Sequence, residues 1–83
     1  MNRKNQFLTF LIVDDQDLAR TVLCHQISEL LPSFVGIEAA NVRQARELLM
    51  RQRVDGVFLD LEMPGGSGMA LLPEIRAMGI PVV

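Results

Sequence analysis

Three short apolar runs, separated by stretches with helical periodicity, constrain the fold of this chain most. Residues 7–13, 34–40 and 57–61 are predicted strands, and the first and third are apolar almost throughout. Strands that do not alternate with polar residues are buried on both faces, as in a parallel sheet covered by helices on each side. Residues 80–83 predict the start of a fourth strand.

The segments between these runs have helical signals. Apolar residues recur every three or four positions from residue 17 to residue 31. Asn41 and Gln44 match a capping box for a second helix that extends to about residue 53. A third helix reaches about residue 78, and we expect Pro73 in its first turn because proline inside a helix costs about 3 kcal/mol.

The resulting order, β-α-β-α-β-α-β, favours an α/β fold with a doubly wound parallel sheet. The chain has 83 residues, 49% of them hydrophobic, and a formal net charge of -2. This composition fits one small domain and excludes a disordered chain. The eight basic and ten acidic residues leave no excess of positive charge, so the composition gives no support for direct nucleic-acid binding. The single cysteine, Cys24, excludes an internal disulfide and agrees with a reducing compartment.

The chain is expected to be cytoplasmic. Arg3 and Lys4 precede the apolar residues 7–13 as in a signal peptide, but that run is short and ends at Asp14 and Asp15 without a small-residue cleavage site. No stretch approaches the roughly 20 apolar residues that a membrane span requires.

Acidic residues end two of the predicted strands. Asp14 and Asp15 follow the first, and Asp60 lies near the end of the third. Sites in open parallel sheets form beyond the carboxyl ends of the strands, so we expect these carboxylates to meet in one crevice. A cation would relieve their repulsion, and hard oxygen ligands suit Mg²⁺. Mg²⁺ can neutralise a transferring phosphoryl group, for which an aspartate can be the nucleophile.

A structural interpretation competes with the functional one at the first acidic pair. Asp14, Asp15 and Asp17 precede or begin a helix, where acidic side chains cap free N–H groups and favour the helix dipole. Asp60 is harder to explain in this way, because a charge in an apolar strand is costly unless a metal or hydrogen bonds compensate it. The combined pattern favours function.

These residues carry a family resemblance. Residues 11–15, Leu-Ile-Val-Asp-Asp, resemble the first strand and acidic pair of bacterial response-regulator receiver domains, and Arg20 and Leu23 stand at the family's usual offsets. Residues 60–68, Asp-Leu-Glu-Met-Pro-Gly-Gly-Ser-Gly, resemble the family's phosphoacceptor loop, in which the glycines would permit a turn. Residues 38–49 match the second strand and helix, so the resemblance covers nearly the whole chain.

The resemblance implies a flavodoxin-like receiver fold with strand order 2-1-3-4-5. Asp60 would accept a phosphoryl group from the phosphohistidine of a sensor histidine kinase or phosphotransfer protein. Asp15, Asp60 and the backbone carbonyl of Glu62 would bind Mg²⁺ directly, and Asp14 would hold it through water. Phosphorylation would shift an equilibrium read by a partner or output domain. The implied chemistry is self-phosphorylation and autodephosphorylation, without other enzymatic activity.

Residues 80–83, where the sequence stops, match the start of the family's fourth strand. We therefore expect residues 1–83 to be a receiver domain whose C-terminal part, on the order of 40 residues, is missing. The family's Thr or Ser and its Lys, which would contact the phosphoryl oxygens, have no counterpart here, so phosphorylation is expected to be slow or undetectable. An unpaired strand edge and uncovered apolar surface predict self-association.

Two other functions stay open. One is a receiver-like module for protein interaction or dimerisation that is not phosphorylated. The other is a Mg²⁺ phosphohydrolase, which fits less well because residues 60–62 lack the second Asp of common aspartyl phosphatases. Residues 65–68 lack the Lys-Ser/Thr of a P-loop, and Cys24 and His25 diverge on a helix, so neither predicts a ligand site.

Overall fold

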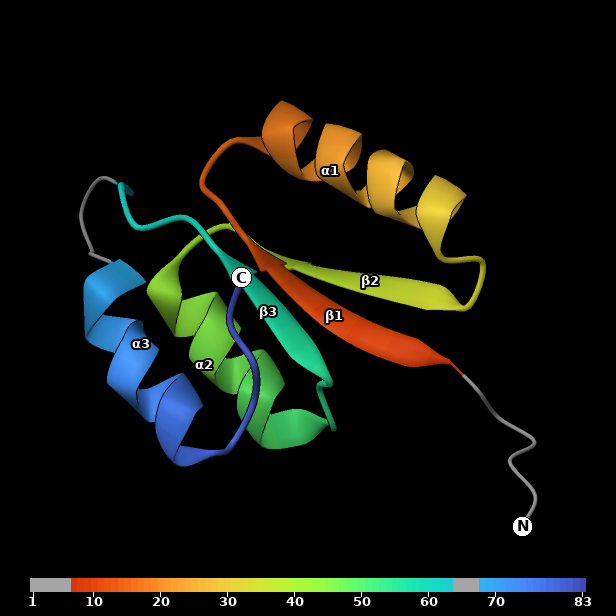
Figure 1. The fold of residues 1–83 in the computed structure, drawn as a ribbon. Helices are drawn as coiled ribbons and strands as arrows, with labels where there is room; N and C mark the ends of the chain where they lie inside the picture. The colour runs from red at the N-terminus through yellow and green to blue at the C-terminus, as the bar shows by residue number, and fades with distance from the viewer. Residues whose placement is uncertain (1–6, 64–67) are drawn as a thin grey trace, which may run out of the picture.

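A three-stranded parallel sheet with helices on both faces forms the described part of the chain, residues 7–63 and 68–83 of this computed structural model (Figure 1). In chain order, the elements are β1 (Leu8–Val13), α1 (Asp17–Leu30), β2 (Phe34–Ala39), α2 (Val42–Arg51), β3 (Gly56–Leu59) and α3 (Gly68–Ala77). The strand order is β2-β1-β3, with α1 on one face and α2 and α3 on the other. The predicted doubly wound α/β fold is confirmed.

The register of the sheet aligns the carboxyl ends of β1 and β3. Val13 pairs with Leu59, so the residues that follow them, Asp14 and Asp60, leave the sheet at the same level. The Asp60 N–H donates to the Val13 carbonyl at 2.9 Å, and the Asp14 N–H donates to the Ala39 carbonyl at 3.1 Å. Backbone hydrogen bonds therefore hold both aspartates at one edge of the sheet.

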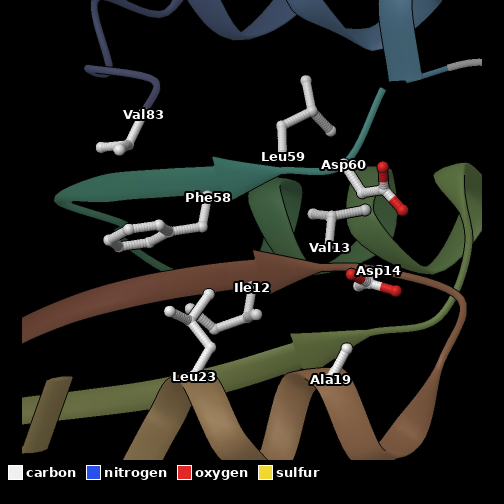
Figure 2. A pocket seen from close by; sticks show the side chains of 9 residues that line it. All are labelled: Ile12, Val13, Asp14, Ala19, Leu23, Phe58, Leu59, Asp60 and Val83. Atoms are coloured by element: carbon white, nitrogen blue, oxygen red, sulfur yellow. The ribbon is translucent and has the colours of Figure 1, made fainter. Parts of the chain in front are cut away.

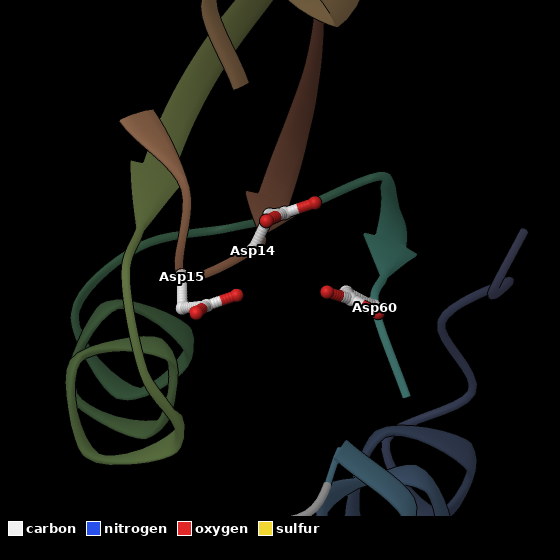
Figure 3. A group of neighbouring side chains, drawn as sticks. All are labelled: Asp14, Asp15 and Asp60. Carbon is white, nitrogen blue, oxygen red and sulfur yellow. The ribbon is translucent and has the colours of Figure 1, made fainter. Parts of the chain in front are cut away.

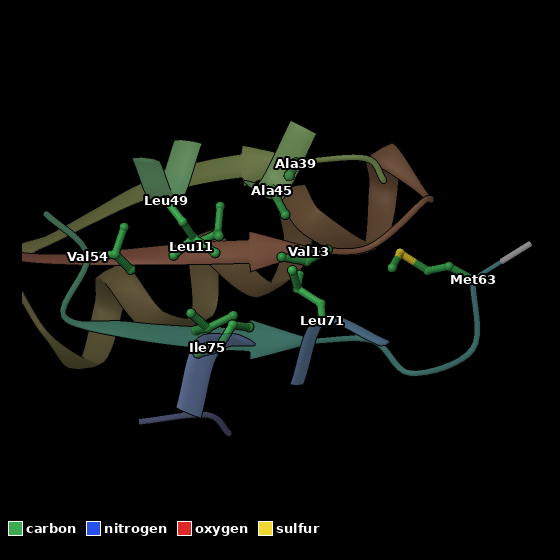
Figure 4. Close-up of a cluster of buried hydrophobic side chains, with 10 residues drawn as sticks. Leu11, Val13, Ala39, Ala45, Leu49, Val54, Met63, Leu71 and Ile75 are labelled. Carbon is green, nitrogen blue, oxygen red and sulfur yellow. The ribbon is translucent and has the colours of Figure 1, made fainter. Parts of the chain in front are cut away.

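The main core lies between the sheet and the α2–α3 layer (Figure 4). Leu11 and Val13 of β1 belong to it, and Ile12 between them lines the face that carries α1. All three are at most 1% exposed, as the continuous apolar run predicts for a strand covered on both faces. The buried members are Leu11, Val13, Ala39, Ala45, Leu49, Val54, Val57, Met63, Leu71 and Ile75.

The other face carries α1 and an aromatic group. The rings of Phe10 and Phe34 lie 5.8 Å apart, and those of Phe10 and Phe58 lie 5.7 Å apart, so the group crosses all three strands. Ile27 is the buried residue of α1, whereas Val22 and Leu30 are 46% and 80% exposed. The contact made by α1 is thus narrower than the helical spacing of its apolar residues indicates.

The helix ends follow the sequence signals in two places. The Gln44 N–H donates to Asn41 Oδ1 at 2.8 Å, and the Gln44 side chain accepts from the Ala40 N–H at 2.8 Å, which confirms the capping interaction. Gly79 adopts a φ of 75° after α3, a conformation that favours glycine at a helix end. The Gly79 N–H donates to the Arg76 carbonyl at 2.9 Å.

The prediction for Pro73 is wrong. It lies inside α3, which begins five residues earlier at Gly68, and not in a first turn. Proline cannot donate an N–H to the preceding turn, but its side chain is exposed while Leu71 and Ile75 are fully buried. Burial of these two side chains against the sheet offsets the missing hydrogen bond.

The predicted fourth strand, residues 80–83, is a single parallel bridge between Val57 and Val82 in the structure. The Val57 N–H donates to the Pro81 carbonyl at 3.0 Å, and the Val83 N–H donates to the Val57 carbonyl at 2.8 Å. The segment therefore lies beside β3 as expected. Pro81 has no N–H to contribute, which limits the ladder.

Within residues 7–63 and 68–83, no helix has the length and apolar character needed to cross a membrane.

Candidate metal-binding site

Three carboxylates meet beyond the ends of β1 and β3 (Figure 3). Asp14, Asp15 and Asp60 each offer one oxygen, and these oxygens lie within 4.8 Å of one another. Asp14 and Asp60 are partly buried and Asp15 is exposed. The predicted crevice of carboxylates is therefore present, with side chains contributed by two adjacent strands.

Local backbone hydrogen bonds orient two of these side chains. Asp14 Oδ1 accepts from the Gln16 N–H at 2.9 Å, and Asp60 Oδ1 accepts from the Glu62 N–H at 2.9 Å. Each of these two hydrogen bonds forms a turn in which the aspartate side chain accepts from the backbone N–H two residues later in the sequence. An ionised carboxylate has about four acceptor positions, so each side chain keeps capacity for a cation.

The cluster fits a hard divalent cation. Its donors are carboxylate oxygens, they converge from two strands, and the exposure of Asp15 leaves room for water around an ion. Mg²⁺ prefers oxygen ligands and keeps several of its waters. The Glu62 side chain is exposed, and residues 64–67 of the predicted acceptor loop lie outside the described residues. The part of the Glu62 carbonyl in metal binding stays a prediction.

Arg20 lies behind the acidic pair, with its side chain only 11% exposed. Nη1 donates to the Asp14 carbonyl at 2.6 Å, Nε donates to Glu38 Oε1 at 2.9 Å, and Nη2 donates to Asp17 Oδ1. Burial lowers the pKa of Arg20, but the hydrogen bonds to Glu38 and Asp17 outweigh it and raise that pKa above its ordinary value. The side chain is a permanent cation beside the cluster.

Gly68 brings the start of α3 against the backbone of Asp60. A Cβ atom at position 68 would overlap with the Asp60 carbonyl oxygen and would lie 3.1 Å from the Cα atom of Leu61. The sequence pattern assigned the glycines of this segment to a turn. At Gly68 the structure shows a different requirement, the close approach of two backbones, which depends on the packing of α3 and is invisible in the sequence.

A pocket of about 310 Å³ extends from the carboxylates between α1 and β3 (Figure 2). Asp14 and Asp60 lie at one end of it, and most of its other lining is apolar. The lining residues are Ile12, Val13, Asp14, Ala19, Leu23, Phe58, Leu59, Asp60 and Val83.

Cys24 and His25 do not join the carboxylate cluster. Cys24 is half-buried, and burial raises the pKa of its thiol. His25 Nε2 lies 3.3 Å from Glu29 Oε2 on the exposed side of α1. Among the residues described, neither belongs to a group of three or more side chains that could hold a metal ion.

Comparison with protein families gives one consistent result. The family model described as the response regulator receiver domain matches residues 10–83. The sensory transduction protein LytR of Staphylococcus haemolyticus is 38% identical over 71 residues, which are 86% of this chain and 28% of that protein. Stress response regulator protein 1 of Candida tropicalis is 35% identical over 68 residues, 82% of this chain and 26% of that protein.

Another relative is the cyclic di-GMP phosphodiesterase response regulator RpfG of Xanthomonas campestris pv. campestris. It is 32% identical over 80 residues, which are 92% of this chain and 21% of that protein. The chain thus spans between a fifth and a third of the length of these curated relatives.

Solved structures show the same likeness. The response regulator TrrA of Thermotoga maritima, in complex with Mg²⁺-BeF, superposes with a TM-score of 0.78 at 32% identity, covering 87% of this chain and 61% of that one. TrrA in complex with the histidine kinase ThkA gives a TM-score of 0.80 at 29% identity, covering 92% of this chain and 66% of that one.

Proposed function

Because the chain belongs to the response regulator receiver domain family, we propose that it accepts a phosphoryl group at Asp60 with the help of Mg²⁺. The observation that carries this proposal is the convergence of Asp14, Asp15 and Asp60, whose carboxylate oxygens lie within 4.8 Å of one another. The relative TrrA, solved with Mg²⁺-BeF, supports the choice of cation.

The proposed chemistry is a displacement at phosphorus. A carboxylate oxygen of Asp60 forms the new P–O bond, the P–N bond of a phosphohistidine breaks, and the leaving imidazole regains a proton. Mg²⁺, when bound, neutralises charge on the transferring group. The hydrogen bond from the Glu62 N–H holds Asp60 Oδ1 in a fixed orientation, and the Asp60 N–H bond to Val13 fixes the backbone beneath it.

We propose the remaining roles in the same way. Asp15, Asp60 and the Glu62 carbonyl bind Mg²⁺ directly, and Asp14 holds it through water. The phosphoryl donor is a histidine kinase or phosphotransfer protein, as the complex of ThkA with TrrA supports. Residues 1–83 act as a regulatory receiver that controls a partner or output domain, and relatives such as RpfG support an output with its own activity.

Labelling with a small phosphodonor tests the proposal. The full chain is incubated with acetyl phosphate or phosphoramidate in the presence and absence of Mg²⁺, and intact-mass spectrometry follows the addition of one phosphoryl group. We expect slow, Mg²⁺-dependent labelling of the wild type and none of Asp60→Asn. Glu47→Gln removes an exposed carboxylate on α2 and serves as the matched control.

Equal labelling of wild type and Asp60→Asn would contradict the assignment of Asp60. An absence of labelling in every sample would contradict phosphoacceptance and favour the alternative, a receiver-like interaction module.

A further inference from the structure

We propose that Arg20 is a positioning residue for the metal site, because its guanidinium group fixes the backbone that carries Asp14 and Asp15. This inference rests on the proposed function, since it concerns the affinity of the same carboxylates for Mg²⁺. Arg20 itself donates to none of the three carboxylates of the cluster in the hydrogen bonds described.

Arg20 joins β2 to the residues that lead from β1 into the first turn of α1. Its Nη1 donates to the carbonyl of Asp14 after β1, its Nε donates to Glu38 in β2, and its Nη2 donates to Asp17 at the start of α1. Glu38 stands opposite Ile12 in the β1–β2 register, so the sheet fixes the backbone that carries its carboxylate. The side chain therefore acts as a clamp between β2 and the loop that leads from β1 to α1.

Arg20 affects the site through the Asp14 carbonyl oxygen, which accepts its hydrogen bond. On the other side of the same residue, the Asp14 N–H donates to the Ala39 carbonyl at 3.1 Å. Hydrogen bonds thus hold the Asp14 backbone at both its N–H and its carbonyl. The Gln16 N–H, which donates to Asp14 Oδ1, orients the Asp14 side chain. The Asp14 carbonyl that accepts from Arg20 shares a peptide group with the Asp15 nitrogen. The hydrogen bond therefore also positions the backbone of Asp15.

The shape of the guanidinium group is essential to this role. It is planar and offers five N–H donors in a fixed arrangement, whereas the ammonium group of lysine is a single point charge on a flexible chain. Lysine at position 20 would keep the charge but could not bond the Asp14 carbonyl, Glu38 and Asp17 in the same geometry. Arg20→Lys therefore removes the three-way hydrogen bonding while it keeps the positive charge, so the two effects can be measured separately.

The charge of Arg20 and its positioning role predict opposite changes in Mg²⁺ affinity when the arginine is removed. A cation close to the cluster repels Mg²⁺, and its loss also leaves Asp17 and Glu38 unneutralised, so electrostatics alone would make Arg20→Gln bind Mg²⁺ more tightly. Loss of the clamp instead lets the Asp14 and Asp15 carboxylates move, which weakens binding. Changes in the groups that orient metal ligands typically cost 10- to 100-fold in metal affinity.

The test is a Mg²⁺ titration of the full chain followed by ¹H–¹⁵N NMR, which reports folding and affinity in one experiment. We expect Mg²⁺ affinity to fall by about tenfold in both Arg20→Gln and Arg20→Lys. The ¹H–¹⁵N heteronuclear NOE of the Asp15 and Gln16 amides should also fall, because the loop loses its anchor. Arg53→Gln makes the same charge change next to Asp55, which bonds Thr9 at the opposite end of β1, and should leave the affinity unchanged.

Tighter or unchanged Mg²⁺ binding in folded Arg20→Gln would overturn the proposal, and so would wild-type affinity in Arg20→Lys. If Arg20→Gln does not fold, the spectrum shows it and Arg20→Lys decides. Absence of Mg²⁺ binding in the wild type would instead contradict the proposed function, so the two failures are distinguishable.

Discussion

At the scale of single residues, Gly68 links the packing of α3 to the proposed phosphoacceptor. We expect Gly68→Ala to destabilise the fold by about 1–3 kcal/mol, the usual cost of overpacking, because its methyl group would overlap with the Asp60 carbonyl. The strain should move the Asp60 backbone and weaken Mg²⁺ binding. Urea denaturation and NMR titration measure the two effects.

Gly79→Ala is the matched control for that substitution. Gly79 has a positive φ and nothing within 4 Å of an added Cβ, so alanine should cost about 1–2 kcal/mol through backbone strain alone. Mg²⁺ affinity should not change in this variant. A Gly68→Ala protein with unaltered affinity would show that α3 does not position Asp60.

The candidate site could be predicted from the sequence only in part, and the reason lies in how its residues are brought together. Asp14, Asp15 and Asp60 end apolar strands, and parallel strands place their carboxyl ends at one edge. The contact of Arg20 with Glu38 forms only when α1 packs beside β2, and that of Gly68 with the Asp60 backbone only when the start of α3 approaches the residues after β3. No spacing in the sequence indicates them.

At the scale of elements, an ion pair joins α2 to α3. Arg46 donates to both carboxylate oxygens of Glu74, at 2.8 and 2.7 Å. These hydrogen bonds hold the pKa of Glu74 below its ordinary value of 4.5. A carboxylate whose pKa is lowered by folding stabilises the fold above its ordinary pKa, and this contribution is lost as the pH falls through the folded value.

We therefore expect Glu74→Gln to be less stable than the wild type at pH 7 and to lose less stability on acidification below pH 4.5. Both side chains are about half exposed, so the effect is small and shrinks as salt is added. Urea denaturation of wild type, Glu74→Gln and Arg46→Gln across this pH range provides the measurement. In both variants the free energy of unfolding should fall less on acidification than in the wild type. The same fall in Glu74→Gln as in the wild type would contradict the account.

The elements themselves were largely predictable, since buried strands and capped helices have local signatures. The helix after Asn41 begins where its capping residues indicate, and β1 follows its apolar run. The error at Pro73 and the short pairing of residues 80–83 both arise where local rules meet tertiary packing. Burial of Leu71 and Ile75 keeps the helix regular across a proline, and Pro81 limits the pairing beside β3.

At the scale of the whole molecule, self-association stays a prediction. The pocket between α1 and β3 is lined mainly by apolar side chains, and Val83 at its margin is 70% exposed. Apolar surface of this kind favours association with a second copy. Gel filtration with light scattering should show a dimer or larger species, and Phe58→Lys within the pocket should shift it toward monomer. A folded wild-type species of 9.3 kDa would contradict this prediction.

The central claim is that Asp14, Asp15 and Asp60 form one cation site that prepares Asp60 for phosphorylation. A Mg²⁺ titration of wild type, Asp15→Asn and Asp60→Asn, followed by ¹H–¹⁵N NMR, tests it most directly. Each substitution removes a charged ligand and keeps its size, so affinity should fall by at least about tenfold in both, while Glu47→Gln stays at the wild-type value. Wild-type affinity in both aspartate variants would contradict the claim.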